Sequence, residues 1–163
     1  MRKISTKMIV ITLVIGIPAF FLGPMIWPPS SDIHPTQAQL PYLIVLSLIE
    51  ALAFGFGVAF LIYGWPRVRA ASGDSTRIAR FMYISLAWLA LSWWPHDNLH
   101  IFNALDINGL IVIDYAFHLT LIIAGFVLTY SFFALFKGAE ERVGARKDCT
   151  AGEPGCVLSA IHP

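Results

Sequence analysis

The sequence predicts an all-α integral membrane protein: a bundle of four transmembrane helices with one short interfacial helix between the third and the fourth. Of its 163 residues, 57% are apolar and only 13% are charged, which is outside the usual range of soluble domains. A membrane-spanning helix needs about 20 mostly apolar residues. Four stretches approach or exceed that length, at residues 8–27, 40–63, 78–94 and 109–136, and they make one transmembrane domain over residues 1–137.

The first stretch, residues 8–27, is preceded by Arg2 and Lys3 and therefore also resembles a secretory signal peptide. No small-residue cleavage pattern comes after it. Gly23-Pro24 and Pro28-Pro29 are instead typical of a helix end followed by a stiff turn. We therefore expect this segment to be retained as the first span.

The second stretch carries small residues at every fourth position: Ala51, Gly55 and Ala59. This spacing lines small side chains along one side of a helix and allows another helix to approach closely. We expect a helix pair within the chain, with contact to a second copy as the alternative. The connection that follows, residues 66–76, contains Ala-Ser-Gly-Asp-Ser and is predicted to be a flexible loop.

The interfacial helix is predicted from the segment after the third stretch, which reads Trp-Trp-Pro-His-Asp-Asn-Leu-His. Pro95 suits the first turn of a helix, and a carboxylate such as Asp97 favours the positive end of the helix dipole there. Leu99, Phe102 and Leu105 would form its apolar side, and Asn108-Gly109 its end. If this helix folds over the outer mouth of the bundle, His96 and His100 approach Asp114 and His118 at the outer end of the fourth span.

The basic residues predict the topology. Lys and Arg occur before the first stretch, between the second and third, and after the fourth, but residues 28–39 and 95–108 contain none. Because Lys and Arg are retained on the cytoplasmic side, both termini are predicted to be cytoplasmic in a plasma membrane protein. Residues 138–163 are polar and are predicted to form a flexible cytoplasmic tail. Cys149 and Cys156 lie in it, and no role is predicted for them.

Ionisable residues without a basic partner predict a functional site. Glu50, Asp114 and His118 lie within predicted spans, where an unpaired charge costs several kcal/mol. Because the outer side lacks Lys and Arg, their counterpart must be a bound cation or a proton. Residues four apart share one face of a helix. Two pairs have this spacing, and they predict a metal site with Glu50 as a further ligand or proton carrier: His96 with His100, and Asp114 with His118.

A set of imidazole and carboxylate ligands favours copper or iron, with zinc as a further candidate. Haem is less expected, because two axial histidines on facing helices are needed and only His118 lies well inside a span. Asp114 and His118 resemble the Asp and His four residues apart in the copper-containing membrane monooxygenases. The further histidine of that family is matched here by Ser131, so the resemblance covers two residues and no family is assigned.

These observations predict a membrane metalloprotein that acts in redox chemistry or metal handling, within a larger membrane complex or as a homo-oligomer. One alternative is a non-catalytic structural or assembly subunit of such a complex. Another is a proton-coupled carrier in which the buried acids and His118 relay protons. The chain contains no phosphate-binding loop, dinucleotide fingerprint or G-x-S-x-G motif, so no nucleotide is expected as a partner. Its net charge of +1 gives no hint of nucleic acid binding, so no nucleic acid is expected either.

Overall fold

The computed structural model describes residues 6–32, 34–73 and 75–150, with side chains as far as Phe136. All regular secondary structure in the described residues is helical, without strands. Three helical segments are long and apolar enough to cross a bilayer: Thr6–Ile26 (α1), Leu40–Tyr63 (α2) and Ile107–Phe136. They correspond to the predicted first, second and fourth spans, so the helical membrane character of the chain is confirmed to that extent.

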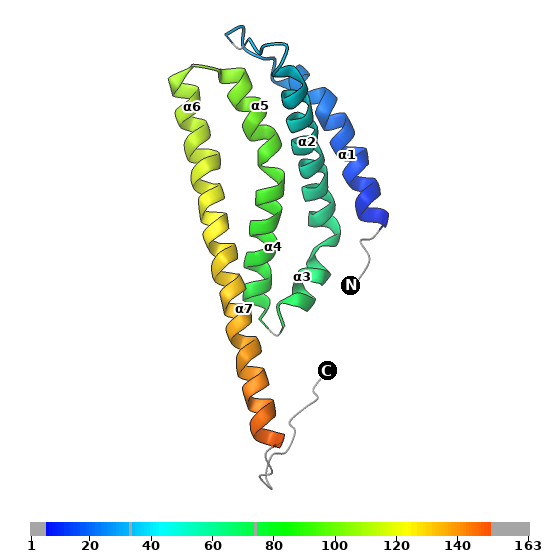
Figure 1. The fold of residues 1–163 in the computed structure, drawn as a ribbon, viewed down its shortest axis with the longest axis vertical. Helices are drawn as coiled ribbons and strands as arrows, with labels where there is room; N and C mark the ends of the chain where they lie inside the picture. Colours follow the sequence, from blue (N-terminus) through cyan, green and yellow to red (C-terminus); the bar gives the residue numbers. More distant parts are fainter. Residues whose placement is uncertain (1–5, 33, 74, 151–163) are drawn as a thin grey trace.

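The predicted third span is divided into two helices. Thr76–Leu91 (α4) has 16 residues, fewer than the roughly 20 needed to cross a bilayer alone, and Trp93–Asn103 (α5) follows it. The single residue between them, Ser92, keeps helical dihedral angles (φ −78°, ψ −24°), so α5 continues along α4 (Figure 1). It contacts α1, α2 and α6. The short helix after the third stretch is therefore present, but it continues α4 and does not fold over the mouth of the bundle.

A short helix, Trp65–Ala71 (α3), occupies most of the connection that was predicted to be a flexible loop. Pro66 lies in its first turn, where a missing N–H costs no hydrogen bond. Gly73, with a positive φ of 58°, follows α3 as part of the turn toward α4. The N-cap of α4 is Ser75, whose side chain accepts a hydrogen bond from the backbone N–H of Ile78.

The small-residue stripe of α2 packs against α1. Ala51 and Ala59 are fully buried, and a Cβ atom added to Gly55 would lie 2.3 Å from the carbonyl oxygen of Thr12. Gly16 on α1 is similarly close to the backbone of α2. The two backbones meet where neither helix has a side chain, so the prediction of an internal helix pair is confirmed.

The last rod of the bundle combines Ile107–Ile113 (α6), Asp114–Leu119 (η1) and Thr120–Thr150 (α7). The segment η1 is a π-helix, a widened turn that is frequent at functional sites. The α7 helix runs well past residue 138, where the flexible tail was predicted to begin, because this part is rich in the strong helix formers Ala, Glu, Arg and Lys. Residues 151–163, including Cys156, lie outside the described part, as does the side chain of Cys149.

The two ends of the bundle differ in charge. Figure 1 shows the start of α1, helix α3 and the start of α4 at one end, where Lys7, Arg67, Arg69, Arg77 and Arg80 belong to these helices. We call this the basic end. The opposite end, which holds the connections from α1 to α2 and from α5 to α6, is the loop end. Residues 28–63 and 81–136 contain no Lys or Arg.

Candidate metal centre

Three histidines meet between α5 and η1. His96 and His100 come from α5 and His118 comes from η1. One ligand nitrogen from each ring lies within 4.8 Å of the other two. The ring centroids are 4.6 Å apart for His96 and His100, 4.7 Å for His96 and His118, and 5.7 Å for His100 and His118. We call these three residues the histidine cluster.

Local packing holds η1 where its histidine reaches α5. The Trp88 ring of α4 stacks on Phe117, with centroids 6.0 Å apart and an interplanar angle of 9°. Its indole N–H donates a hydrogen bond of 3.0 Å to the Thr120 hydroxyl. That hydroxyl in turn donates to the carbonyl oxygen of Ala116 at 2.6 Å, which supplies a donor to a carbonyl group of the π-helix. The adjacent helix α4 therefore sets the position of His118.

Asp114 and His118 interact as their spacing predicts. The Oδ1 atom of Asp114 lies 2.7 Å from Nδ1 of His118. The backbone between them is a π-helix, whose hydrogen bonds link residues five apart, and the two side chains still share a face. Asp114 thus lies behind His118 and outside the group of mutually close ligand atoms.

The Nδ1 atom of His96 also contacts a carboxylate. The Oδ1 atom of Asp97 lies 2.6 Å from Nδ1 of His96. The sequence assigned Asp97 only a helix-start role, because adjacent residues on a helix normally point in different directions. No sequence signal distinguished this contact. The two sites differ in exposure: the His96 side chain is 7% exposed, whereas that of His118 is 46% exposed.

The two carboxylates determine which ring nitrogens face each other. A carboxylate accepts hydrogen bonds only, so Nδ1 of His96 and Nδ1 of His118 must each carry the proton. In a neutral ring the other nitrogen, Nε2, is then an unprotonated acceptor. These two Nε2 atoms lie 2.8 Å apart. Two lone pairs repel at this distance, so the pair requires a cation between or beside the rings, either a shared proton or a metal ion.

Glu50 extends this arrangement onto α2. Its side chain is buried, with 8% of the residue exposed, and it interacts with the carboxyl group of Asp97. Two carboxyl groups form a hydrogen bond only when one of them holds a proton. Glu50 is not in the group of close ligand atoms. Of the five residues predicted as ligands, the structure thus gathers three imidazoles and places Glu50 and Asp114 around them.

His100 lies outside the three candidate spans, and its surroundings disfavour its charged form. Burial lowers its pKa from the ordinary value, and the nearby His96 and His118 lower it further, although Asp97 and Asp114 act in the opposite direction. A neutral imidazole is the form that binds a metal ion.

Comparison of the chain with protein-family models, with curated proteins and with solved structures found no significant match.

Proposed function

We propose that this chain is a membrane metalloprotein that binds one copper or iron ion through His96, His100 and His118. The observation that carries the proposal is the pair of Nε2 atoms that face each other at 2.8 Å while both Nδ1 atoms are held by carboxylates. Carboxylate–histidine–metal arrangements of this kind fix the tautomer and make the imidazole a better ligand.

The dimensions of the cluster suit a small cation. For tetrahedral bonds of about 2.0 Å, neighbouring ligand nitrogens lie about 3.3 Å apart. The His96 and His118 nitrogens are closer than this, and all three ligand atoms fall within 4.8 Å. To bind the ion, Nε2 of His96 and Nε2 of His118 would have to move apart by about half an ångström, and the His100 ring would have to move slightly inward. Small rotations of these side chains allow both movements.

The chemistry of the ligands favours copper or iron. Imidazole suits both metals, and zinc is the competing occupant. Three protein ligands leave a coordination position for an exchangeable group, which is the arrangement of reactive rather than structural sites. The half-exposed His118 side chain offers access to that position. This supports redox chemistry or metal transfer as the role.

The setting we propose is a plasma membrane protein with four crossings and both termini in the cytoplasm. The third crossing would consist of α4 together with the start of α5. The basic end would face the cytoplasm and the loop end the exterior, so the cluster would lie in the outer half of the bundle. Large apolar side chains are widely exposed on the described helices, which favours contact with lipid and with a membrane-protein partner or a second copy.

Metal analysis of the purified full-length protein tests the proposal. Wild type, His118→Ala and His34→Ala are loaded with Cu(I), Fe(II) or Zn(II), passed over a desalting column and analysed by plasma mass spectrometry. We expect close to one copper or iron ion per chain in wild type and in His34→Ala, and at least a tenfold loss in His118→Ala. His34→Ala is the matched control because His34 is not part of the cluster. Equal metal content in all three proteins, or none in wild type, would leave a shared proton as the counterpart of the histidines and reject the proposal.

A further inference from the structure

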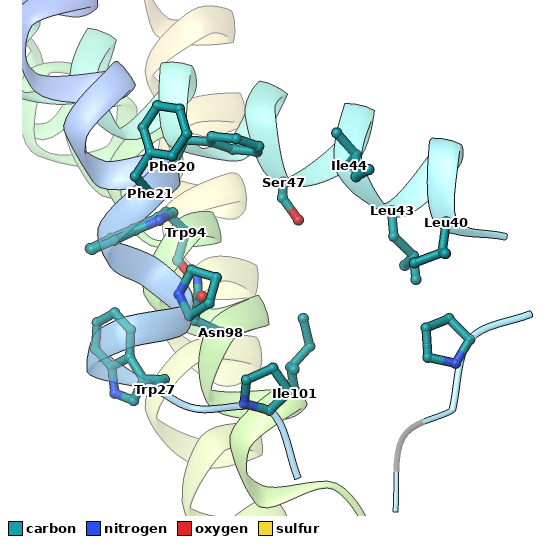
Figure 2. A pocket seen from close by; sticks show the side chains of 13 residues that line it. Phe20, Phe21, Trp27, Leu40, Leu43, Ile44, Ser47, Trp94, Asn98 and Ile101 are labelled. Atoms are coloured by element: carbon teal, nitrogen blue, oxygen red, sulfur yellow. The ribbon is translucent and has the colours of Figure 1, made fainter. Parts of the chain in front are cut away.

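A second feature of the loop end is a cavity between α1, α2 and α5, with a volume of about 440 Å³. Its walls are mostly apolar and aromatic. Figure 2 shows the side chains that surround it, and those used below are Phe20, Trp27, Leu43, Ser47, Trp94 and Asn98. Ligand pockets for small molecules have volumes of about 300–1,000 Å³ and mainly apolar walls with a few polar groups. The cavity has this character.

The cavity and the histidine cluster lie on opposite sides of α5. Successive residues of an α-helix are rotated by about 100°, so Trp94 and Asn98 share one face. His96 and His100 lie about 200° around the axis from these residues by the same spacing. Contacts within the structure agree: Trp94 packs on Trp27, the residue that follows α1, with ring centroids 5.2 Å apart, whereas His96 faces His118 of η1. An occupant of the cavity therefore would not touch the cluster.

Two neutral polar side chains line the cavity. The Asn98 amide donates through Nδ2 to the carbonyl oxygen of Trp94 at 2.7 Å, so its Oδ1 remains an acceptor. This oxygen lies against Gly23, where an added Cβ would be only 2.7 Å away. The absence of a side chain at Gly23 makes room for the amide. On the opposite wall, the Ser47 hydroxyl points into the cavity in Figure 2.

The charge around the cavity limits the ligand. Neither Lys nor Arg lines it, and none occurs in residues 28–63 or 81–136. A carboxylate or phosphate buried there would lack a cation, which is costly in an apolar site. A hydroxyl group can donate a hydrogen bond to Asn98 Oδ1, or exchange hydrogen bonds with Ser47 on the opposite wall. An apolar chain fits the aromatic and aliphatic walls.

We propose that this cavity binds a neutral lipid-class molecule with a long apolar chain and a hydroxyl head group. The site is independent of the metal centre and of the function proposed above. Phe20, Trp27 and Leu43 contact the chain, and Asn98 orients the hydroxyl. The amide and the Ser47 hydroxyl are the groups that distinguish an alcohol from a hydrocarbon of the same length.

Photolabelling of the full chain in detergent tests this inference. The probe is hexadecanol with a diazirine in its chain, and the labelled peptides are mapped by mass spectrometry. We expect label in residues 20–27 and 40–47, reduced at least fivefold by excess unlabelled hexadecanol and much less by palmitate at pH 8. Label spread evenly over the exposed faces of α7 and not displaced by hexadecanol would overturn the proposal. If palmitate competes as well as hexadecanol, the proposal that the head group must be neutral is overturned.

Two variants provide the structural control. Ser47→Trp fills the cavity and should abolish the displaceable label, whereas Ile122→Trp adds the same side chain at a position of α7 that is 55% exposed and should leave the label unchanged. If Ser47→Trp fails to fold by circular dichroism, Asn98→Leu decides. It should weaken displacement by hexadecanol about three- to tenfold, the value of one hydrogen bond, and leave displacement by hexadecane unchanged. Equal behaviour of Asn98→Leu and wild type would contradict the proposal.

Discussion

Nε2 of His96 and Nε2 of His118 lie 2.8 Å apart, although one belongs to α5 and the other to a π-helix on the neighbouring rod. Each ring is held from behind by a carboxylate, at 2.6 Å for His96 and 2.7 Å for His118. The two histidines are arranged alike: their unprotonated Nε2 atoms face each other, and a carboxylate holds the proton on Nδ1 of each ring. A carboxylate behind each ring makes the imidazole a stronger ligand, so we expect both acids to affect the binding of a cation here.

The first prediction concerns the carboxylate behind His118. Asp114→Asn keeps the size of the side chain but removes its charge, so the Nδ1 proton is held less firmly and the ring becomes a weaker ligand. We expect metal affinity to fall about 10- to 100-fold, the usual effect of losing an outer hydrogen-bonding carboxylate. Competition against a chelator of known affinity measures the change. Asp32→Asn, an exposed loop variant, should retain the wild-type affinity.

The second prediction is a pH dependence of the metal-free protein. The pKa of His100 is lowered in the folded state, chiefly by burial, so the unfolded chain binds more protons at that residue as the pH falls below about 6.5. The contribution of neutral His100 to the free energy of unfolding is therefore fully present at higher pH and is lost on acidification. We expect the unfolding temperature in detergent to fall between pH 7 and pH 5, and to fall less in His100→Gln. An identical slope in the two proteins would contradict this contribution.

The third prediction concerns the contact between α1 and α2. In Gly55→Ala the new Cβ would lie 2.3 Å from the carbonyl oxygen of Thr12, so the two backbones must separate. We expect a destabilisation of about 1–3 kcal/mol, as for other overpacked sites. Gly125→Ala is the control, since nothing lies within 4 Å of a Cβ there and alanine favours a helix more than glycine. Thermal unfolding followed by circular dichroism should show a lower unfolding temperature for Gly55→Ala and an equal or higher one for Gly125→Ala.

Sequence reasoning predicted the parts of this molecule that depend on local pattern. The apolar lengths of α1, α2 and the last rod, and the contact of Asp114 with His118, follow from hydropathy and from spacing along one helix. The course of α5 could not be predicted in this way, because it depends on the helical dihedral angles of Ser92 and on packing against α1, α2 and α6. Glu50 and Asp97 interact through the register of α2 against α5, which no pattern within either segment encodes.

The fourth prediction concerns the packing that positions the π-helix. Thr120→Val is nearly isosteric, but it removes the acceptor for the Trp88 indole N–H. A buried donor left without a partner costs about 1–3 kcal/mol. We expect Thr120→Val to lose about this much stability. We also expect weaker metal binding, because His118 lies only two residues before Thr120 and would be held less firmly. Trp88→Phe in the Thr120→Val background should restore part of the stability, since the unpaired donor is then absent. Additive losses in the double variant would exclude the hydrogen bond as the cause.

The last prediction decides whether α4 and α5 together form a crossing. Helices α1, α2 and the last rod give three crossings, which would put the two termini on opposite sides of the membrane. A fourth crossing by α4 and the start of α5 puts them on the same side. We expect the second result, because the basic residues before α1, in α3 and early α4, and in the tail then all lie in the cytoplasm. Fusions of alkaline phosphatase and of a fluorescent protein after Lys3 and after Pro163 report the side of each terminus. Both termini should give fluorescence without phosphatase activity, and a fusion in the connection near Leu105 should give the reverse. Phosphatase activity at Pro163 would mean three crossings, and α4 with the start of α5 would then not cross the membrane.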